Sequence, residues 1–240
     1  MKNQQLTPNT ALEQTKRIGV GLAFVVFPLV FVFAFGVHPH LLAPQLLGPA
    51  ELIQRAHHND LLQFGHVLVT LNTALLIVVA LHFMQRLRHT AGWAGFIGAA
   101  LAILGTLYLA ADKGALCLTM SALDTLPEAK FGPMLPGLLA MFSKQGWLVL
   151  LWGILLLPIG FAIQASALLR SKTLPRWQGI LFLIGVLLVA VPDGLEIINL
   201  SASILLTIAF VPYGIQLMLN LDQEARQVGK SLVASSKRTA

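Results

Sequence analysis

Charged residues are scarce in this chain. Asp, Glu, Lys and Arg make up 11% of its 240 residues, while hydrophobic residues make up 56%, and the mean hydropathy is +0.77. Because a soluble domain carries about 25% charged residues, this composition excludes a soluble globular protein and indicates an integral membrane protein. Each spanning helix needs about 20 apolar residues, so a chain of this length has room for about six with short connections.

Cysteine is almost absent, since Cys117 is the only one in the chain. A disulfide framework and a cysteine-rich zinc or iron–sulfur site are therefore excluded. The sequence also lacks a glycine-rich phosphate loop, a nucleophile elbow and a lipidation signal. Its net charge of +6 comes from basic residues that are spread over connections and tails. They form no patch interleaved with aromatic residues, so we expect no nucleic-acid partner.

Long apolar runs fill most of the chain. They predict an all-α polytopic integral membrane protein, a bundle of six transmembrane helices that occupies residues 18–219, with cytoplasmic polar tails at 1–17 and 220–240. The expected spans are 18–37, 61–83, 93–111, 147–169, 177–191 and 196–218. The first run is longer than the apolar core of a signal peptide and is followed by no Ala-x-Ala site, so we interpret it as a retained helix.

Lysine and arginine are unevenly divided between alternate connections. With six spans, twelve of them fall on the side of the two tails and four on the opposite side. The positive-inside rule then predicts that both termini are cytoplasmic, and we expect a multi-pass protein of the plasma membrane, here a bacterial inner membrane. The basic turn at 169–179, Leu-Arg-Ser-Lys-Thr-Leu-Pro-Arg-Trp-Gln-Gly, resembles one that recurs in uncharacterised bacterial integral membrane proteins. That resemblance carries over no functional residue.

Two of the expected spans carry a polar stripe at helical spacing. Polar groups that face lipid have no water to bond, so we expect both stripes to turn inward and to face each other or a shared wet cavity. The second and sixth spans would then form a pocket that opens to the non-cytoplasmic side. Its predicted residues are Gln63, His66, Thr70, Thr73, Glu196, Asn199 and Ser203.

Ionisable groups at membrane depth are costly and usually functional, which singles out His66 and Glu196 in this pocket. We therefore expect a small transporter-like or accessory membrane protein that binds a small polar solute, a proton or a cation. Its expected partners are the lipid bilayer and, as one alternative, other membrane subunits. In that alternative the protein is a structural subunit, and changes at Gly95 or Gly98 would disrupt assembly.

A second alternative is a membrane-embedded metal- or haem-dependent enzyme or redox subunit that uses the histidines of the outer half. The candidate metal ligands are His57, His58, Asp60 and His66, since imidazole and carboxylate groups bind zinc, copper or iron. No two span interiors offer histidines at matching depth, which argues against a haem. The sequence names neither a reaction nor a substrate, and it leaves open whether the protein is an enzyme.

Overall fold

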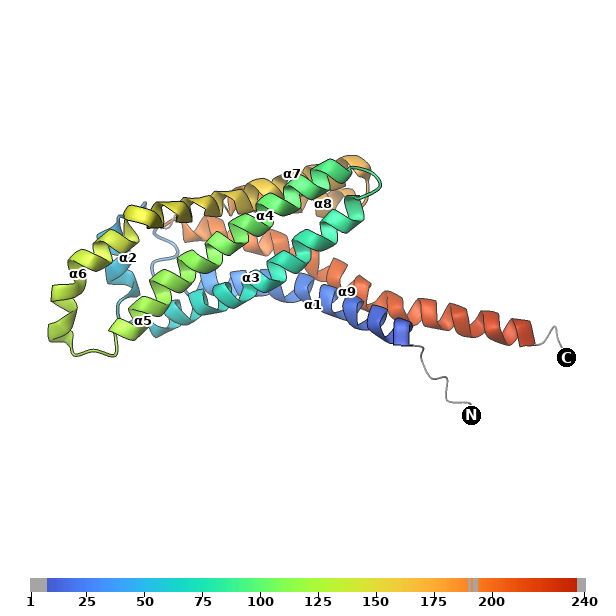
Figure 1. Cartoon of the computed structure of the whole chain (residues 1–240), viewed down its shortest axis with the longest axis horizontal. Helices are drawn as coiled ribbons and strands as arrows, with labels where there is room; N and C mark the ends of the chain where they lie inside the picture. Colours follow the sequence, from blue (N-terminus) through green and yellow to red (C-terminus); the bar gives the residue numbers. More distant parts are fainter. Residues whose placement is uncertain (1–7, 190, 192–193, 237–240) are drawn as a thin grey trace.

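The computed structural model describes residues 8–189, 191 and 194–236, and this part of the chain is helical with no strand (Figure 1). The helices are α1 (Pro8–Gly36), α2 (Pro49–Ala56), α3 (Asp60–Leu87), α4 (Gly92–Lys113), the π-helix η1 (Gly114–Leu118), α5 (Thr119–Leu123), α6 (Glu128–Phe142), the 3₁₀-helix η2 (Gly146–Leu155), α7 (Leu156–Ser171), α8 (Arg176–Leu188) and α9 (Glu196–Ser236).

Five helical segments are long and apolar enough to cross a membrane, and they indicate a multi-pass membrane protein. They are Ala11–Gly36, Asp60–Leu87, Gly92–Leu123, Gly146–Ser171 and Glu196–Leu219. The expected fifth span at 177–191 corresponds to α8, which has 13 residues. At about 1.5 Å per residue this helix extends about 20 Å, less than the roughly 30 Å of a bilayer core. The prediction of six spans is therefore not confirmed.

Six helices close into a ring. α1 packs between α9 and α3, α4 packs between α3 and α7, and α8 packs between α7 and α9. A closed ring has an interior that all its members line, and α8 belongs to it although it is short. The start of α1 and the end of α9 lie at the same end of the ring (Figure 1). We call this the terminal end, and we call the opposite end, which holds α2, α5 and α6, the distal end.

Aromatic side chains fill the ring towards its terminal end. The rings of Phe24, Phe83 and Phe210 contact one another with centroids 5.2–5.8 Å apart, and Phe182 lies 4.7 Å from Phe210. All four side chains are buried. Because this cluster joins α1, α3, α8 and α9, it blocks the interior of the ring at that depth.

Two segments near the distal end depart from α-helical geometry. α4 does not stop at 111 as expected but continues through η1 into α5. The chain then returns as η2, ten residues of 3₁₀-helix, although runs longer than three or four residues are uncommon in that geometry. Tyr108 lies against Gly153, where a β-carbon would meet its ring. Both irregular segments pack against α4.

Candidate ligand cavity

A cavity of about 380 Å³ lies inside the ring. Its walls are apolar side chains from the ring helices, and Phe182 and Phe210 of the aromatic cluster close it towards the terminal end. Most of the other wall residues share this apolar character: Phe27, Phe31, Phe35, Leu76, Val79, Leu109, Leu157, Phe161, Val186 and Leu206. The cavity therefore accepts a hydrocarbon group and offers no polar partner along most of its length.

Charged side chains gather at the distal rim of this cavity. Nζ of Lys144 lies 3.2 Å from Oδ1 of Asp112, an ion pair without hydrogen-bond alignment. Nζ of Lys113 lies 3.7 Å from the other carboxylate oxygen. All three side chains are less than one-fifth exposed. The ammonium group of Lys144 also lies 4.9 Å from the centre of the Trp152 ring, within the range of a cation–π contact.

The amide of Asn199 adds a polar group to the cavity wall. Its Nδ2 donates to the carbonyl oxygen of Val191 at 3.4 Å. Its Oδ1 is buried and has no hydrogen-bond partner among the described residues. Buried polar atoms are nearly always bonded in folded proteins, so this oxygen could accept a hydrogen bond from a ligand.

The hydroxyl groups of the two polar stripes donate hydrogen bonds within their own helices. Thr70 donates to the carbonyl oxygen of His66 at 3.1 Å, Thr73 to that of Thr70 at 2.6 Å, and Ser203 to that of Asn199 at 2.8 Å. Each hydroxyl is thus satisfied by its own helix. Of the expected pocket residues, the structure places Asn199 in the cavity wall.

His66 and Glu196 lie on either side of His38. Nδ1 of His38 is 3.3 Å from Oε1 of Glu196, and the rings of His38 and His66 are 5.2 Å apart in an edge arrangement. Nδ1 of His66 lies 2.8 Å from Sγ of Cys117. His38, which contacts both expected partners, comes from the segment that follows α1.

Gly194 holds the entry to α9 beside this histidine group. Its N–H donates to Oε1 of Glu196 at 2.7 Å, and its carbonyl oxygen accepts from the N–H of Gln45 at 3.0 Å. Its φ is +99°, and a β-carbon would collide with the carbonyl oxygen of Gln45. Only glycine adopts this conformation freely and allows the close approach.

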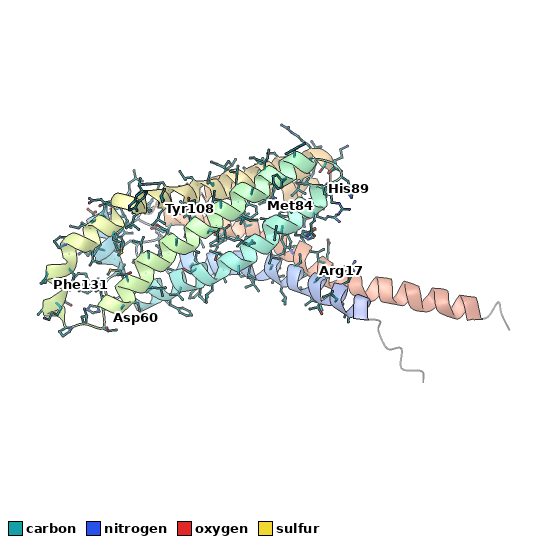
Figure 2. All side chains as sticks on the ribbon, in the orientation of Figure 1. Arg17, Asp60, Met84, His89, Tyr108 and Phe131 are labelled. Atoms are coloured by element: carbon teal, nitrogen blue, oxygen red, sulfur yellow. The ribbon has the colours of Figure 1, made fainter. Side chains whose placement is uncertain are left out.

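A second polar group lies at the surface of the distal end, and it takes in two of the four candidate metal ligands. Nε2 of His57 and Nε2 of His58 lie 3.4 Å and 3.3 Å from Oε2 of Glu128. Asp60 and His66 belong to other surroundings: Asp60 is an exposed residue at the start of α3, and His66 contacts His38. Phe131 of α6, which stacks on His57 with ring centroids 3.8 Å apart, marks this group in Figure 2.

Asp124 lies directly behind the two histidines. It accepts hydrogen bonds from Nδ1 of His57 at 2.6 Å, from the backbone N–H of His58 at 2.9 Å and from Nε2 of Gln63 at 2.6 Å. Burial raises the pKa of the Asp124 carboxyl, but these bonds outweigh burial and hold the pKa below its usual value. Hydrogen bonds from His58 and His57 lower the pKa of Glu128 in the same direction. Both groups are therefore carboxylates at neutral pH.

Comparison with protein-family models, with curated proteins and with solved structures finds no match to this chain. A functional assignment therefore depends on the cavity and the polar groups themselves.

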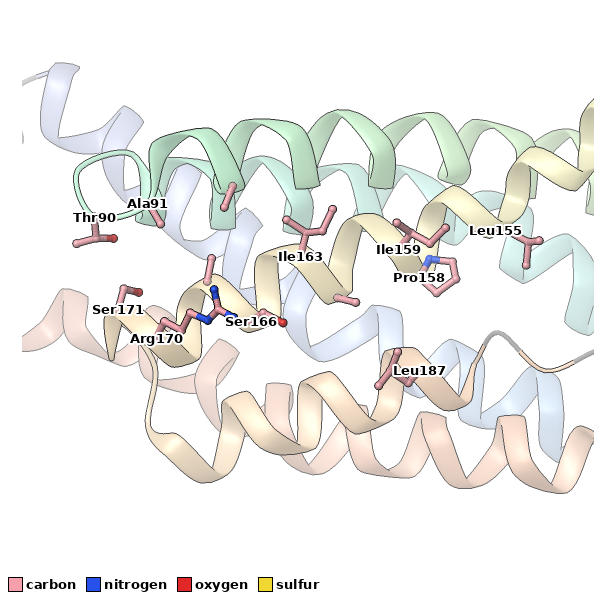
Figure 3. Close-up of a pocket in the computed structure, with 13 residues that line it drawn as sticks. Thr90, Ala91, Leu155, Pro158, Ile159, Ile163, Ser166, Arg170, Ser171 and Leu187 are labelled. Atoms are coloured by element: carbon pink, nitrogen blue, oxygen red, sulfur yellow. The ribbon is translucent and has the colours of Figure 1, made fainter.

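A larger groove of about 880 Å³ runs along the flank of the bundle (Figure 3). Most of its lining belongs to α7, from Pro158 to Arg170 and Ser171 at its end, with Leu155 of η2 and Leu187 of α8 beside them. This groove lies on the flank and is open along one helix. Unlike the cavity inside the ring, it has no buried charged group. We therefore treat the interior cavity as the candidate site.

No sequence motif indicates the residues at the rim of the cavity. Lys144 and Trp152 are far from Asp112 along the chain, and their spacing encodes no motif. The available signal is indirect: Asp112, Lys113 and Lys144 interrupt apolar stretches at the ends of expected spans. A charge at such a place is equally well explained by solvent, so only the folded chain distinguishes a buried rim from a solvated interface.

Proposed function

We propose that the protein binds a single-chain amphiphile with an anionic head group inside its ring of helices, in a transporter-like or accessory role. The observation that carries this proposal is an apolar cavity with the ammonium group of Lys144 at its rim, on a side chain that is only 13% exposed. At about 30 Å³ per methylene, close to the volume that a liquid water molecule takes, the cavity accommodates roughly a dozen methylene groups.

The head group decides the affinity in this proposal. A chain that comes from the bilayer is already in an apolar medium, so its transfer to the cavity brings little hydrophobic gain. An ammonium group has three donors, and Lys144 faces one carboxylate oxygen and one aromatic ring in the structure. It therefore retains the capacity to bind a carboxylate or phosphate oxygen, while Asp112 offsets the cost of burying the charge when no ligand is bound.

Access from the side of the bundle supports a ligand from the membrane. Trp152 and Leu155 line the cavity and are also 58% and 45% exposed on the outer surface. Val189 and Val191 also line the cavity. An opening between η2 and these residues would let a chain enter laterally while its head group stays near the distal end.

Proton or cation handling by the histidine group is a second proposal. His38, His66 and Glu196 form a connected polar group, and Nε2 of His38 is buried without a hydrogen-bond partner among the described residues. Proton-flux measurements in proteoliposomes test this reading with Glu196→Gln. Equal fluxes in the variant and the unmodified protein would exclude it.

We also propose six spans, with α8 and the residues after it as the fifth, and cytoplasmic termini in a bacterial inner membrane. The common position of the start of α1 and the end of α9 supports an even number of crossings. Arg17 and His89 lie at the terminal end (Figure 2). In a Cys117→Ser background, a membrane-impermeant maleimide added to intact cells should label Thr125→Cys and leave Thr90→Cys unlabelled. The reverse pattern would overturn the orientation.

The amphiphile is tested with dodecanoate that carries a photoreactive group on its chain, added to the full-length protein in nanodiscs. Lys144→Gln removes the charge at the rim, and Val186→Phe fills part of the cavity. Lys172→Gln is the matched control because Lys172 is exposed at the terminal end. A hydrogen bond to a charged group contributes about 1.5–3 kcal/mol, so Lys144→Gln should weaken labelling at least about tenfold.

A cavity-filling variant and a cationic probe complete the labelling experiment. We expect Val186→Phe to reduce labelling as well, and a dodecyl trimethylammonium probe of equal length to label poorly. The proposal fails when Lys144→Gln and Lys172→Gln label alike, or when the cationic probe labels as well as the carboxylate.

A further inference from the structure

Two adjacent histidines point their rings the same way at the distal surface. The rings of His57 and His58 are 4.0 Å apart, although consecutive residues of a helix do not face each other. His57 is the C-cap residue directly after α2, and His58 has a left-handed backbone with φ of 52°. This turn brings both Nε2 atoms to the carboxylate of Glu128, at the first position of α6.

We propose that His57, His58 and Glu128 bind one Zn²⁺ ion. One ligand atom from each residue can be chosen so that all three lie within 4.8 Å of one another. Zinc bonds to histidine nitrogen and carboxylate oxygen are about 2.0–2.2 Å long, so neighbouring ligands of a tetrahedral ion are about 3.3–3.6 Å apart. The carboxylate oxygen of Glu128 lies 3.4 Å and 3.3 Å from the two imidazole nitrogens, which matches that spacing.

Asp124 gives His57 the tautomer that a metal ligand needs. Nδ1–H of His57 donates to the carboxylate of Asp124, so the proton that a metal displaces is the one on Nε2, the atom that faces Glu128. A carboxylate behind a ligating histidine is the usual outer partner in zinc sites. Asp124 is itself fixed by Gln63 and by the backbone of His58. It is therefore a positioning residue and not a ligand.

The ligand types select the metal. Two imidazoles and one carboxylate suit zinc and other transition metals, whereas magnesium and calcium require oxygen ligands. Three protein ligands leave a fourth tetrahedral position for water. The side chains of His58 and Glu128 are 57% and 72% exposed, so an ion can enter from solvent without any movement of the helices.

The site is tested on the full-length protein in detergent, purified without a polyhistidine tag and treated with a chelator. Zinc titration followed by calorimetry and metal analysis should give one Zn²⁺ per chain, and Mg²⁺ should not bind. His58→Ala and Glu128→Gln alter exposed side chains and should each weaken zinc binding at least about tenfold. Asp124→Asn should keep the stoichiometry and weaken binding about 10–100-fold, as removal of an outer partner does.

His89→Ala is the matched control, because His89 is an exposed histidine at the terminal end. This variant should bind zinc like the unmodified protein. Co²⁺ in place of Zn²⁺ should give the visible absorption of a tetrahedral ion, and Glu128→Gln should alter it. The proposal is overturned when no zinc binds, or when His58→Ala and Glu128→Gln bind it as tightly as His89→Ala does.

Discussion

The contact between α4 and α7 depends on glycine, and Gly160→Ala tests it. A β-carbon at Gly160 would lie 2.5 Å from the carbonyl oxygen of Gly98 and closer still to the backbone nitrogen of Ala102. Heavy atoms at favourable contact are about 3.5–4.0 Å apart. The two helices must therefore separate by about 1 Å to admit one methyl group, and no change of side-chain rotamer relieves the collision because both neighbours are backbone atoms.

The expected change in stability is the difference between two opposing effects. Overpacking costs about 1–3 kcal/mol, and the rigid neighbours place Gly160→Ala near the upper value. Alanine in a helix is better than glycine by about 0.8–1.0 kcal/mol. The net loss is then about 2 kcal/mol. Gly19→Ala is the matched control because a β-carbon at Gly19 has no neighbour within 4 Å, so it should gain up to about 1 kcal/mol.

Thermal unfolding in detergent, followed by circular dichroism and by the fraction of monodisperse protein, measures this difference. For a protein of this size 1 kcal/mol shifts the midpoint by about 2–4 °C. Gly160→Ala should lower the midpoint by about 4–8 °C, and Gly19→Ala should leave it unchanged or raise it. If both variants raise the midpoint alike, α4 and α7 do not approach as closely as the structure has them.

Four further substitutions, two of them in one double-mutant cycle, have expected outcomes in the same assay. Gln164→Leu removes a buried side chain whose Nε2 donates to carbonyl oxygens of α3 and α4 at 2.9 Å and 3.3 Å, and should cost about 1 kcal/mol. In a double-mutant cycle, His82→Phe and Tyr213→Phe, whose polar atoms are 2.8 Å apart, should show a coupling of about 0.6 kcal/mol, and additive losses would contradict the bond. Gly194→Ala should lower the midpoint by several degrees, since alanine held at a φ of +99° is strained by about 1–3 kcal/mol.

Apolar runs predicted where the long helices lie but not where they end. The third span is expected to end at 111 because the charged residues Asp112 and Lys113 follow it. In the structure Lys144 pairs with Asp112 at the cavity rim, and the helical segment continues through η1 to Leu123. Composition shows where an apolar stretch ends. A helix can continue past that point when the charged residue there has a partner far away in the chain.

The polar stripes were read correctly as helical patterns, but spacing does not reveal what satisfies each group. Thr70, Thr73 and Ser203 donate to carbonyl oxygens of their own helices. The helical spacing of these residues is the same whether their hydroxyls bond to their own helix or face a pocket. The pair of His57 and Asp124 is 67 residues apart in the chain. Such a contact arises only when α5 and α6 fold back over α2, so no local signal predicts it.

α6 joins the two proposed sites. Its first residue, Glu128, faces His57 and His58, and Lys144 at the cavity rim follows its last residue, Phe142, by two positions. Leu138 of the same helix is buried against the cluster that includes Ile53, which fixes the middle of α6 to α2. A zinc ion at Glu128 would restrain the start of this helix in addition. Because a short helix held at its start and its middle has little freedom at its end, metal at the surface would then limit where the ammonium group of Lys144 can lie.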